Sequence, residues 1–143
     1  MRTALYAFAL AAFLSGCASM SGSETQRLAL STKGEDGKSI EGVRCKLQND
    51  RGSWEASSPG FVHVRRSSED LHVECTKDGS KHGVLKAVSR ASESMMGNMI
   101  MPGGSIGAMV DHSTGKGYDY PDELPVEMGN TVLVDRRPAE AVK

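Results

Sequence analysis

Four histidines and three cysteines are the side chains of this sequence that could carry the widest range of chemistry. His63 and His72 lie in two alternating stretches, FVHVRR and LHVECTK, which the short SSED stretch would join into a β-hairpin. With a two-residue turn, His63 lies directly opposite His72 on the outward face, close enough for both to bind one metal ion. With a four-residue turn, His63 faces Glu74 and Arg65 faces His72. The first register would allow a small-ligand or metal-binding face formed by His63 and His72.

A zinc site needs three or four ligands, and His82 or His112 would have to supply the others from loops. We therefore expect solvated surface histidines, and the His63/His72 face is the alternative interpretation. Ser113 follows His112 directly, but the side chains of sequence neighbours point apart, and no acid is placed to orient the histidine. The sequence predicts neither a metal site nor a nucleophilic catalytic set.

Carboxylates and glycines give no stronger indication of an enzyme. Glu69, Asp70 and Glu74 belong to a turn and its exit, where acidic residues are common for ordinary reasons. The glycines within residues 103–107 do not follow a strand of a βαβ unit, so they do not form a phosphate-binding loop. We therefore expect a protein that is not an enzyme and that binds no cofactor.

The first cysteine follows an apolar leader. Arg2 precedes an apolar run from Ala4 to Leu14, which is typical of a secretory signal and too short for a membrane-spanning helix of about 20 residues. Leu14-Ser15-Gly16-Cys17 resembles the bacterial lipobox, which implies that residues 1–16 are removed and that Cys17 is lipidated. The alternative is an ordinary cleaved signal peptide with a cysteine at the junction.

The lipobox resemblance also implies a location. The mature chain would be anchored in the cell envelope by palmitate and related acyl chains, with its domain in the periplasm or at the cell surface. Ala18 follows the cysteine where an aspartate would favour the inner membrane, so the outer membrane is the expected one. The formal net charge of -1 gives no electrostatic field for binding nucleic acid.

The other two cysteines form an even pair in an oxidising compartment. Cys45 and Cys75 each share the parity of a valine and a leucine two or four positions away, so both face the core of a β domain. A Cys45–Cys75 disulfide is predicted, and two buried free thiols are the alternative.

Short alternating runs divided by turn residues predict a mainly β fold, a small antiparallel β-sandwich with one disulfide. Pro125 would confine the expected last strand, Leu124–Met128, to a sheet edge. The expected organisation is a signal peptide at 1–16, a flexible tether at 17–24, the sandwich at 25–128 with an insertion at 94–117, and a C-terminal tail at 129–143.

The insertion, residues 94–117, is named here the Gly/Met-rich segment. Residues 94–110 carry no charged side chain and are rich in methionine and glycine. As a helix they would reach about 25 Å, short of the roughly 30 Å hydrocarbon layer, and Pro102 would break that helix. The segment would pack over an open end of the core, or lie exposed against lipid headgroups or a protein partner, or form a self-associating glycine seam. The candidate contact residues are Met96, Met99, Ile100, Met101, Ile106, Met109, Tyr118 and Tyr120.

A second resemblance rests on three spaced motifs: G-N-x-x-x-x-G-G-x-I-G at Gly97–Gly107, V-D-x-x-T-G at Val110–Gly115 and Y-x-Y-P at Tyr118–Pro121. Together with a Cys-paired β domain they are similar to a group of small Gram-negative envelope lipoproteins with PEGA-like β domains. The resemblance implies an envelope β-sandwich and no catalytic residue. We expect a lipid-anchored, non-catalytic interaction or structural module, with the membrane and an envelope protein as partners.

Overall fold

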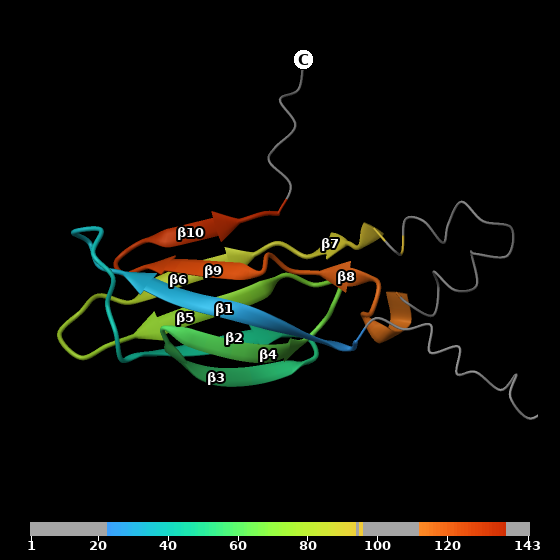
Figure 1. The fold of residues 1–143 in the computed structure, drawn as a ribbon, viewed down its shortest axis with the longest axis horizontal. Helices are drawn as coiled ribbons and strands as arrows, with labels where there is room; N and C mark the ends of the chain where they lie inside the picture. The colour runs from blue at the N-terminus through green and yellow to red at the C-terminus, as the bar shows by residue number, and fades with distance from the viewer. Residues whose placement is uncertain (1–22, 94, 96–111, 137–143) are drawn as a thin grey trace, which may run out of the picture.

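The protein is built mainly from β-strands in two packed sheets (Figure 1). A computed structural model of the chain describes residues 23–93, 95 and 112–136. Its strands are β1 (Thr25–Lys33), β2 (Val43–Asn49), β3 (Gly52–Ser58), β4 (Gly60–Arg65), β5 (Leu71–Thr76), β6 (Gly83–Ala87), β7 (Arg90–Ala91), β8 (Tyr118–Asp119), β9 (Glu123–Glu127) and β10 (Thr131–Val134). No helix of the described residues is long and apolar enough to cross a membrane. The expected fold class, a mainly β sandwich with one disulfide, is confirmed.

The larger sheet has the strand order β10-β6-β5-β2-β3, and the smaller sheet has the order β4-β1-β9. Neighbouring strands run antiparallel, except that β9 is parallel to β1 and β10 is parallel to β6. A short ribbon of β7 and β8 extends from one end of the sandwich. Because β7 follows β6 of the larger sheet and β8 leads into β9 of the smaller one, this ribbon connects the two layers.

Alternation along each strand decides which side chains enter the core. Every second residue of β2 and of β5 is buried, and the residues between them are exposed or half-buried. The core consists of Leu28, Leu30, Val43, Cys45, Leu47, Val62, Val64, Leu71, Val73, Cys75, Leu85, Ala87, Tyr120, Leu124, Val126 and Met128. Among the described residues Tyr120 is the only aromatic member of this core, which is made mostly of aliphatic side chains.

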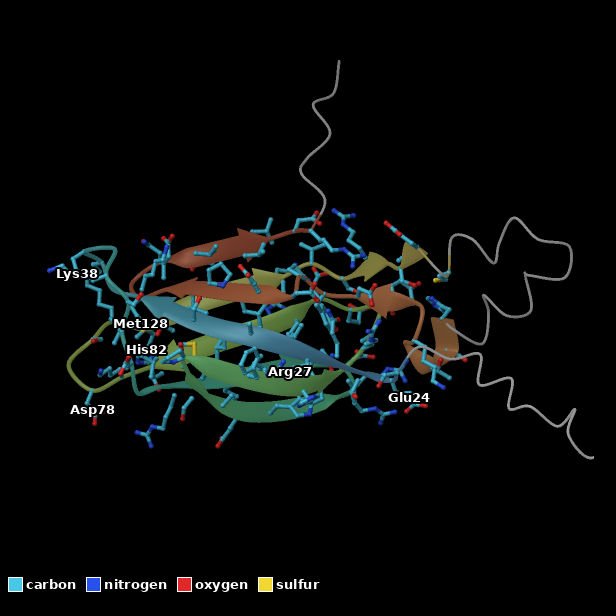
Figure 2. The ribbon with its side chains drawn as sticks, in the orientation of Figure 1. Glu24, Arg27, Lys38, Asp78, His82 and Met128 are labelled. Atoms are coloured by element: carbon cyan, nitrogen blue, oxygen red, sulfur yellow. A yellow bond between two sulfur atoms is a disulfide. The ribbon has the colours of Figure 1, made fainter. Side chains whose placement is uncertain are left out.

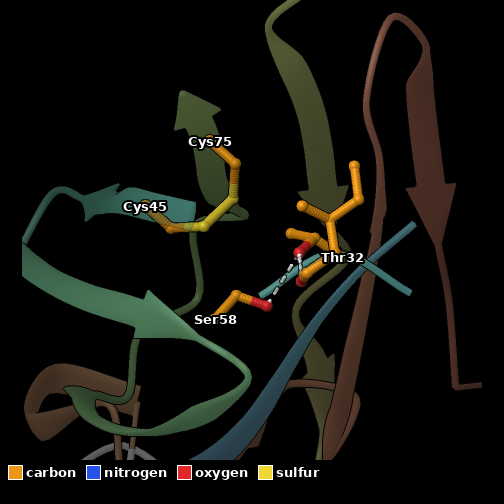
Figure 3. Close-up of a disulfide and its surroundings, with 5 residues drawn as sticks. Thr32, Cys45, Ser58 and Cys75 are labelled. Atoms are coloured by element: carbon orange, nitrogen blue, oxygen red, sulfur yellow. Dashed lines mark hydrogen bonds between the residues drawn. A yellow bond between two sulfur atoms is a disulfide. The ribbon is translucent and has the colours of Figure 1, made fainter. Parts of the chain in front are cut away.

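The predicted disulfide joins Cys45 and Cys75 (Figure 3). The two residues lie directly opposite each other on the adjacent strands β2 and β5, with their Cα atoms 4.0 Å apart. Both are buried, and the bond closes a loop with a sequence separation of 30. The alternative of two buried free thiols does not apply to this structure.

A buried hydrogen bond between hydroxyl groups links the two sheets beside the disulfide (Figure 3). Thr32 of β1 and Ser58 of β3 are 1–2 % exposed, and their hydroxyl oxygens lie 3.1 Å apart. Thr32 also donates to the carbonyl of Ile40 over 2.9 Å. The hydroxyl groups of the pair are therefore satisfied within the core, as buried polar groups need to be.

The predicted hairpin between FVHVRR and LHVECTK is wrong. β4 pairs with β1 in the smaller sheet, whereas β5 pairs with β2 and β6 in the larger one. The connecting residues 66–70 therefore cross from one layer to the other. Val62 and Val64 still face inward, but they lie in the opposite layer from Leu71 and Val73 instead of beside them. Alternation specifies which face of a strand is buried but not which strand lies beside it. The predicted hairpin and the observed crossing therefore bury the same side chains.

The sandwich also extends beyond Met128, where the sequence places its end. Gly129 adopts a φ of 86° in the turn after β9, and β10 then pairs with β6. Residues 131–134 therefore belong to the domain and not to a tail. The expectation for Pro125 is confirmed, because β9 is an edge strand of the smaller sheet. The N–H of Ala29 donates to the carbonyl of Asp122 over 2.8 Å, which fixes a register in which the nitrogen of Pro125 faces away from β1.

Candidate functional site

The Gly/Met-rich segment is attached at one end of the sandwich. Arg90 and Ala91 of β7 pair with Asp119 and Tyr118 of β8. Beyond that pair, the N–H of Ser92 donates to the carbonyl of Gly117 over 2.7 Å. The chain therefore enters and leaves the segment on adjacent strands, at the end of the sandwich where β1 begins (Figure 1).

Arginine–carboxylate pairs fasten both strands of this ribbon to the body of the domain. On β8, the Asp119 carboxylate accepts hydrogen bonds from Arg66 and, over 3.2 Å, from Arg136. On β7, the Arg90 guanidinium binds the Asp135 carboxylate through more than one nitrogen. Ion-paired arginines with several contacts fix geometry more strongly than a single exposed pair does. The base of the segment is thus held in a defined place.

Residues 112–117, the returning end of the segment, pack against the loops of the sandwich. Gly115 is buried with a φ of 80°, and a Cβ placed there would collide with the backbone carbonyl of Arg66. The Arg51 guanidinium donates to the carbonyl of Ser113 over 3.0 Å. These contacts make Gly115 the position where close packing and a left-handed backbone both require glycine.

A Gly115→Ala substitution is expected to destabilise the domain by about 1–3 kcal/mol, because the methyl group meets a fixed carbonyl in a strained backbone region. The measurement is chemical denaturation of the purified domain. Gly79→Ala is the matched control, because Gly79 has a φ of 77° but open space around its Cβ position. Equal losses for the two variants would mean that backbone conformation alone, and not packing of the segment end, explains the effect.

Glu24 joins the tether region to the segment. It is the last residue before β1, and its carbonyl accepts the N–H of Arg66 over 2.8 Å. Its carboxylate pairs with Arg65 at 3.3 Å and with Lys116 at 3.6 Å. The point where the predicted tether enters the fold and the point where the segment returns to it are therefore in side-chain contact. Figure 2 shows Glu24 at this end of the sandwich and Lys38, Asp78 and His82 at the opposite end. We name the end with Glu24 and the β7–β8 ribbon the tether end.

The two tyrosines predicted as contact residues have different environments. Tyr118 is half-buried, with its ring edge-on to the ring of His112 at 5.5 Å and its hydroxyl bonded to His112 Nδ1. Tyr120 is 0 % exposed, so the prediction that it contacts a partner is wrong. It is a core residue because the Y-x-Y-P stretch turns inward toward β9 at this point.

Tyr120 is surrounded by polar groups that satisfy it. Its hydroxyl donates to the carbonyl of Glu69 over 2.7 Å and accepts from the Asn49 amide over 2.9 Å. Gln26 binds its backbone: the Gln26 carbonyl accepts the Tyr120 N–H, and the Gln26 amide donates to the Tyr120 carbonyl, each over 2.9 Å. Burial raises the pKa of the Tyr120 phenol to about 12, so it stays protonated as a donor.

The histidines do not form the predicted shared face. His63 is exposed on β4 of the smaller sheet, and His72 is exposed on β5 of the larger sheet. Because the neighbours of both residues point into the core between the sheets, the two imidazoles point away from the sandwich on opposite sides. His82 bonds Glu74 at 3.3 Å with both side chains exposed. No group of three or more His, Cys, Asp or Glu among the described residues is arranged to hold a metal ion.

Two shallow depressions lie on or beside the larger sheet. One, of about 490 Å³, crosses the outer face of β3, β2 and β5 and is lined by Arg44, Cys45, Lys46, Glu55, Ala56, Ser57, Glu74 and Thr76. The other, of about 450 Å³, lies near the tether end and includes Glu69, Asp70, His72 and Lys86. Burial opposes ionisation of Asp70, but the Ser89 N–H and the Lys86 ammonium outweigh it and lower the Asp70 pKa. The carboxylate therefore serves to hold the loop through these partners.

Several predicted residues fall outside the described part of the chain. They are Cys17 and the contact candidates Met96, Met99, Ile100, Met101, Ile106 and Met109. Sequence reasoning missed Gln26, Asn49, Glu24 and the arginines at the tether end. A signal for Gln26 was present, since it occupies the inward parity of TQRLALS with Leu28 and Leu30.

Comparison with known proteins adds no family to this description. No protein-family model, curated protein or solved structure matches the chain significantly.

Proposed function

We propose that this protein is a lipid-anchored envelope lipoprotein whose domain is a non-catalytic interaction module, with the Gly/Met-rich segment as its contact surface. The observation that carries the proposal is the contact of Glu24 with Lys116. Glu24 ends the predicted tether, and Lys116 lies at the returning end of the segment. An anchor attached through the tether therefore holds the same end of the domain from which the segment emerges.

The length of the tether sets the distance of this end from a membrane. From Cys17 to Glu24 an extended chain spans at most about 25 Å. A lipid on Cys17 would thus keep the tether end within that distance of the bilayer surface. The segment would then operate next to lipid headgroups or to the membrane-proximal part of another envelope protein.

The attachment of the segment supports a role in recognition. Each strand of the ribbon carries an ion-paired residue, Arg90 on β7 and Asp119 on β8, and Gly115 fixes the returning end against the body. A fixed base presents a contact surface at a lower entropic cost than a freely hinged one. The uncharged, Met- and Ile-rich composition of residues 95–110 suits an apolar contact.

The test replaces residues 95–110 by a short Gly-Ser linker in the full chain and leaves residues 112–117 in place. Proximity labelling in the native envelope is expected to lose at least one neighbour of the wild-type protein, because the contact surface is gone while the Cys45–Cys75 domain stays folded. A matched control replaces the Lys77–Ser80 turn at the opposite end, which should keep the same neighbours. An unchanged set of neighbours in the deletion would contradict the contact role.

The anchor is tested separately in the same system. A Cys17→Ala chain is expected to lose palmitate incorporation and to leave the membrane fraction. If palmitate is absent from the wild-type chain, the anchor is wrong, whatever the deletion shows.

A further inference from the structure

In the described part of the chain the sandwich has four edge strands, which differ in how they are protected against pairing with another strand. Natural edge strands usually carry a charged residue or a proline that discourages such pairing. Edge strand β3 contains Glu55, β4 contains Arg65, and β9 contains Pro125 between two glutamates. Strand β10, with the sequence TVLV, has neither a charge nor a proline. It lies at the outer edge of the larger sheet in Figure 1.

Only alternate residues of β10 direct their backbone N–H and C=O groups toward β6. The N–H of Val84 donates to the carbonyl of Asn130 over 3.0 Å, and the N–H of Val88 donates to that of Val134 over 2.9 Å. This parallel register directs the polar groups of Val132 and Val134 toward β6. The N–H and C=O groups of Thr131 and Leu133 consequently face away from β6, toward no other strand of the described chain.

The side chains of β10 are also incompletely covered. Leu133 is 66 % exposed, the most exposed large apolar side chain of the described residues. Phe61, the other such residue, has the Arg27 guanidinium over its ring at 3.5 Å. Leu133 has no comparable cover, and on the inner side of the strand Val132 and Val134 are only half-buried.

We propose that β10 pairs antiparallel with β10 of a second copy of this chain, centred on Leu133. In this register Leu133 faces its own counterpart, Thr131 faces Asp135, and Asn130 faces Arg136 of the second copy. The outward N–H and C=O groups of Leu133 then pair with those of its counterpart, and no charged residue faces a like charge. The pairing joins the two five-stranded sheets into one continuous sheet.

This self-complementarity is the reason for choosing a second copy of this chain as the partner of β10. A two-fold pairing needs one sequence to complement itself, and the stretch from Asn130 to Arg136 does so without a charge clash. A four-residue strand buries less area than a standard stable interface, so the dimer is weak in dilute solution. The lipid anchor proposed above would confine both copies to one membrane surface, which would raise their effective concentration and favour pairing.

The first test places a single cysteine at the centre of the pairing. Directly opposed residues of an antiparallel hydrogen-bonded pair have Cα atoms about 5.5 Å apart, which suits a disulfide. Leu133→Cys in the full chain, in native membranes under mild oxidation, is expected to give several-fold more covalent dimer than the control Phe61→Cys. Equal yields, or disulfides formed mainly with other proteins, would overturn the second copy as the occupant.

The second test blocks the edge without using a cysteine. Leu133→Pro removes an N–H that faces away from β6, as the nitrogen of Pro125 faces away from β1, and Leu133→Lys adds a protecting charge. Both variants are expected to lower the dimer fraction in sedimentation of the detergent-solubilised chain several-fold, with the unfolding midpoint unchanged for Leu133→Lys. Phe61→Lys should keep the wild-type dimer fraction. A dimer fraction that survives Leu133→Lys would overturn the proposal.

Discussion

Replacing Cys45 and Cys75 together by alanine is expected to lower the free energy of unfolding by about 3–4 kcal/mol. The bond closes a loop with a sequence separation of 30 between strands that already lie side by side. Its loss returns conformational freedom to the unfolded chain, which the native pairing of β2 with β5 does not offset. The measurement is denaturant unfolding of the oxidised wild type and of the double variant.

Reduced wild-type protein is the matched control for this change. If the bond itself stabilises the domain, wild type with its cysteines reduced should unfold close to the double variant, apart from the small loss of two buried sulfur atoms. A difference of less than about 1 kcal/mol between oxidised wild type and the double variant would contradict the entropic argument.

The disulfide could be predicted because parity along a strand is a local property. Cys45 and Cys75 each share the parity of a nearby valine and leucine, so any β arrangement that buries those neighbours also buries the cysteines. The same reasoning located most of the core. Pro125 was equally informative, since a residue without an N–H has few places in a sheet.

The pairing of strands could not be predicted in the same way. SSED between two apolar runs suits a hairpin, but residues 66–70 carry the chain to the other sheet. There the Ser89 hydroxyl donates to the carbonyl of Ser67, and the Ser89 N–H donates to Asp70. These partners lie about 20 residues further along the chain, so no local pattern contains them. The separation of His63 from His72 follows directly from this crossing.

The tether end shows the same limit for the candidate site. Glu24, Arg66 and Lys116 look like ordinary surface charges in the sequence, and only the fold brings them together. Tyr120 looked like a neighbour of Tyr118 with the same exposure. Its burial depends on Gln26, which is 94 residues away along the chain.

Replacing Gln26 by alanine is expected to cost about 2–4 kcal/mol of unfolding free energy. Gln26 is 7 % exposed and satisfies both the N–H and the C=O of Tyr120, while its amide also donates to the Asp122 carboxylate over 3.0 Å. Alanine leaves two buried backbone groups without partners, each at a cost of about 1–3 kcal/mol. Denaturant unfolding measures the loss, and a change below about 1 kcal/mol would mean that water or a backbone shift replaces the missing amide.

Gln26→Glu separates hydrogen bonding from side-chain size, because the two side chains have nearly the same shape. At neutral pH the carboxylate still accepts the Tyr120 N–H, but it places oxygen against the Tyr120 carbonyl and negative charge against Asp122. As the pH falls, a protonated carboxyl group can donate to that carbonyl again. The stability deficit relative to wild type at the same pH should therefore be large at neutral pH and shrink on acidification. A stability deficit that does not depend on pH would contradict the argument that Gln26 contributes by donating to the Tyr120 carbonyl. Packing of the Gln26 side chain would then explain its contribution to stability.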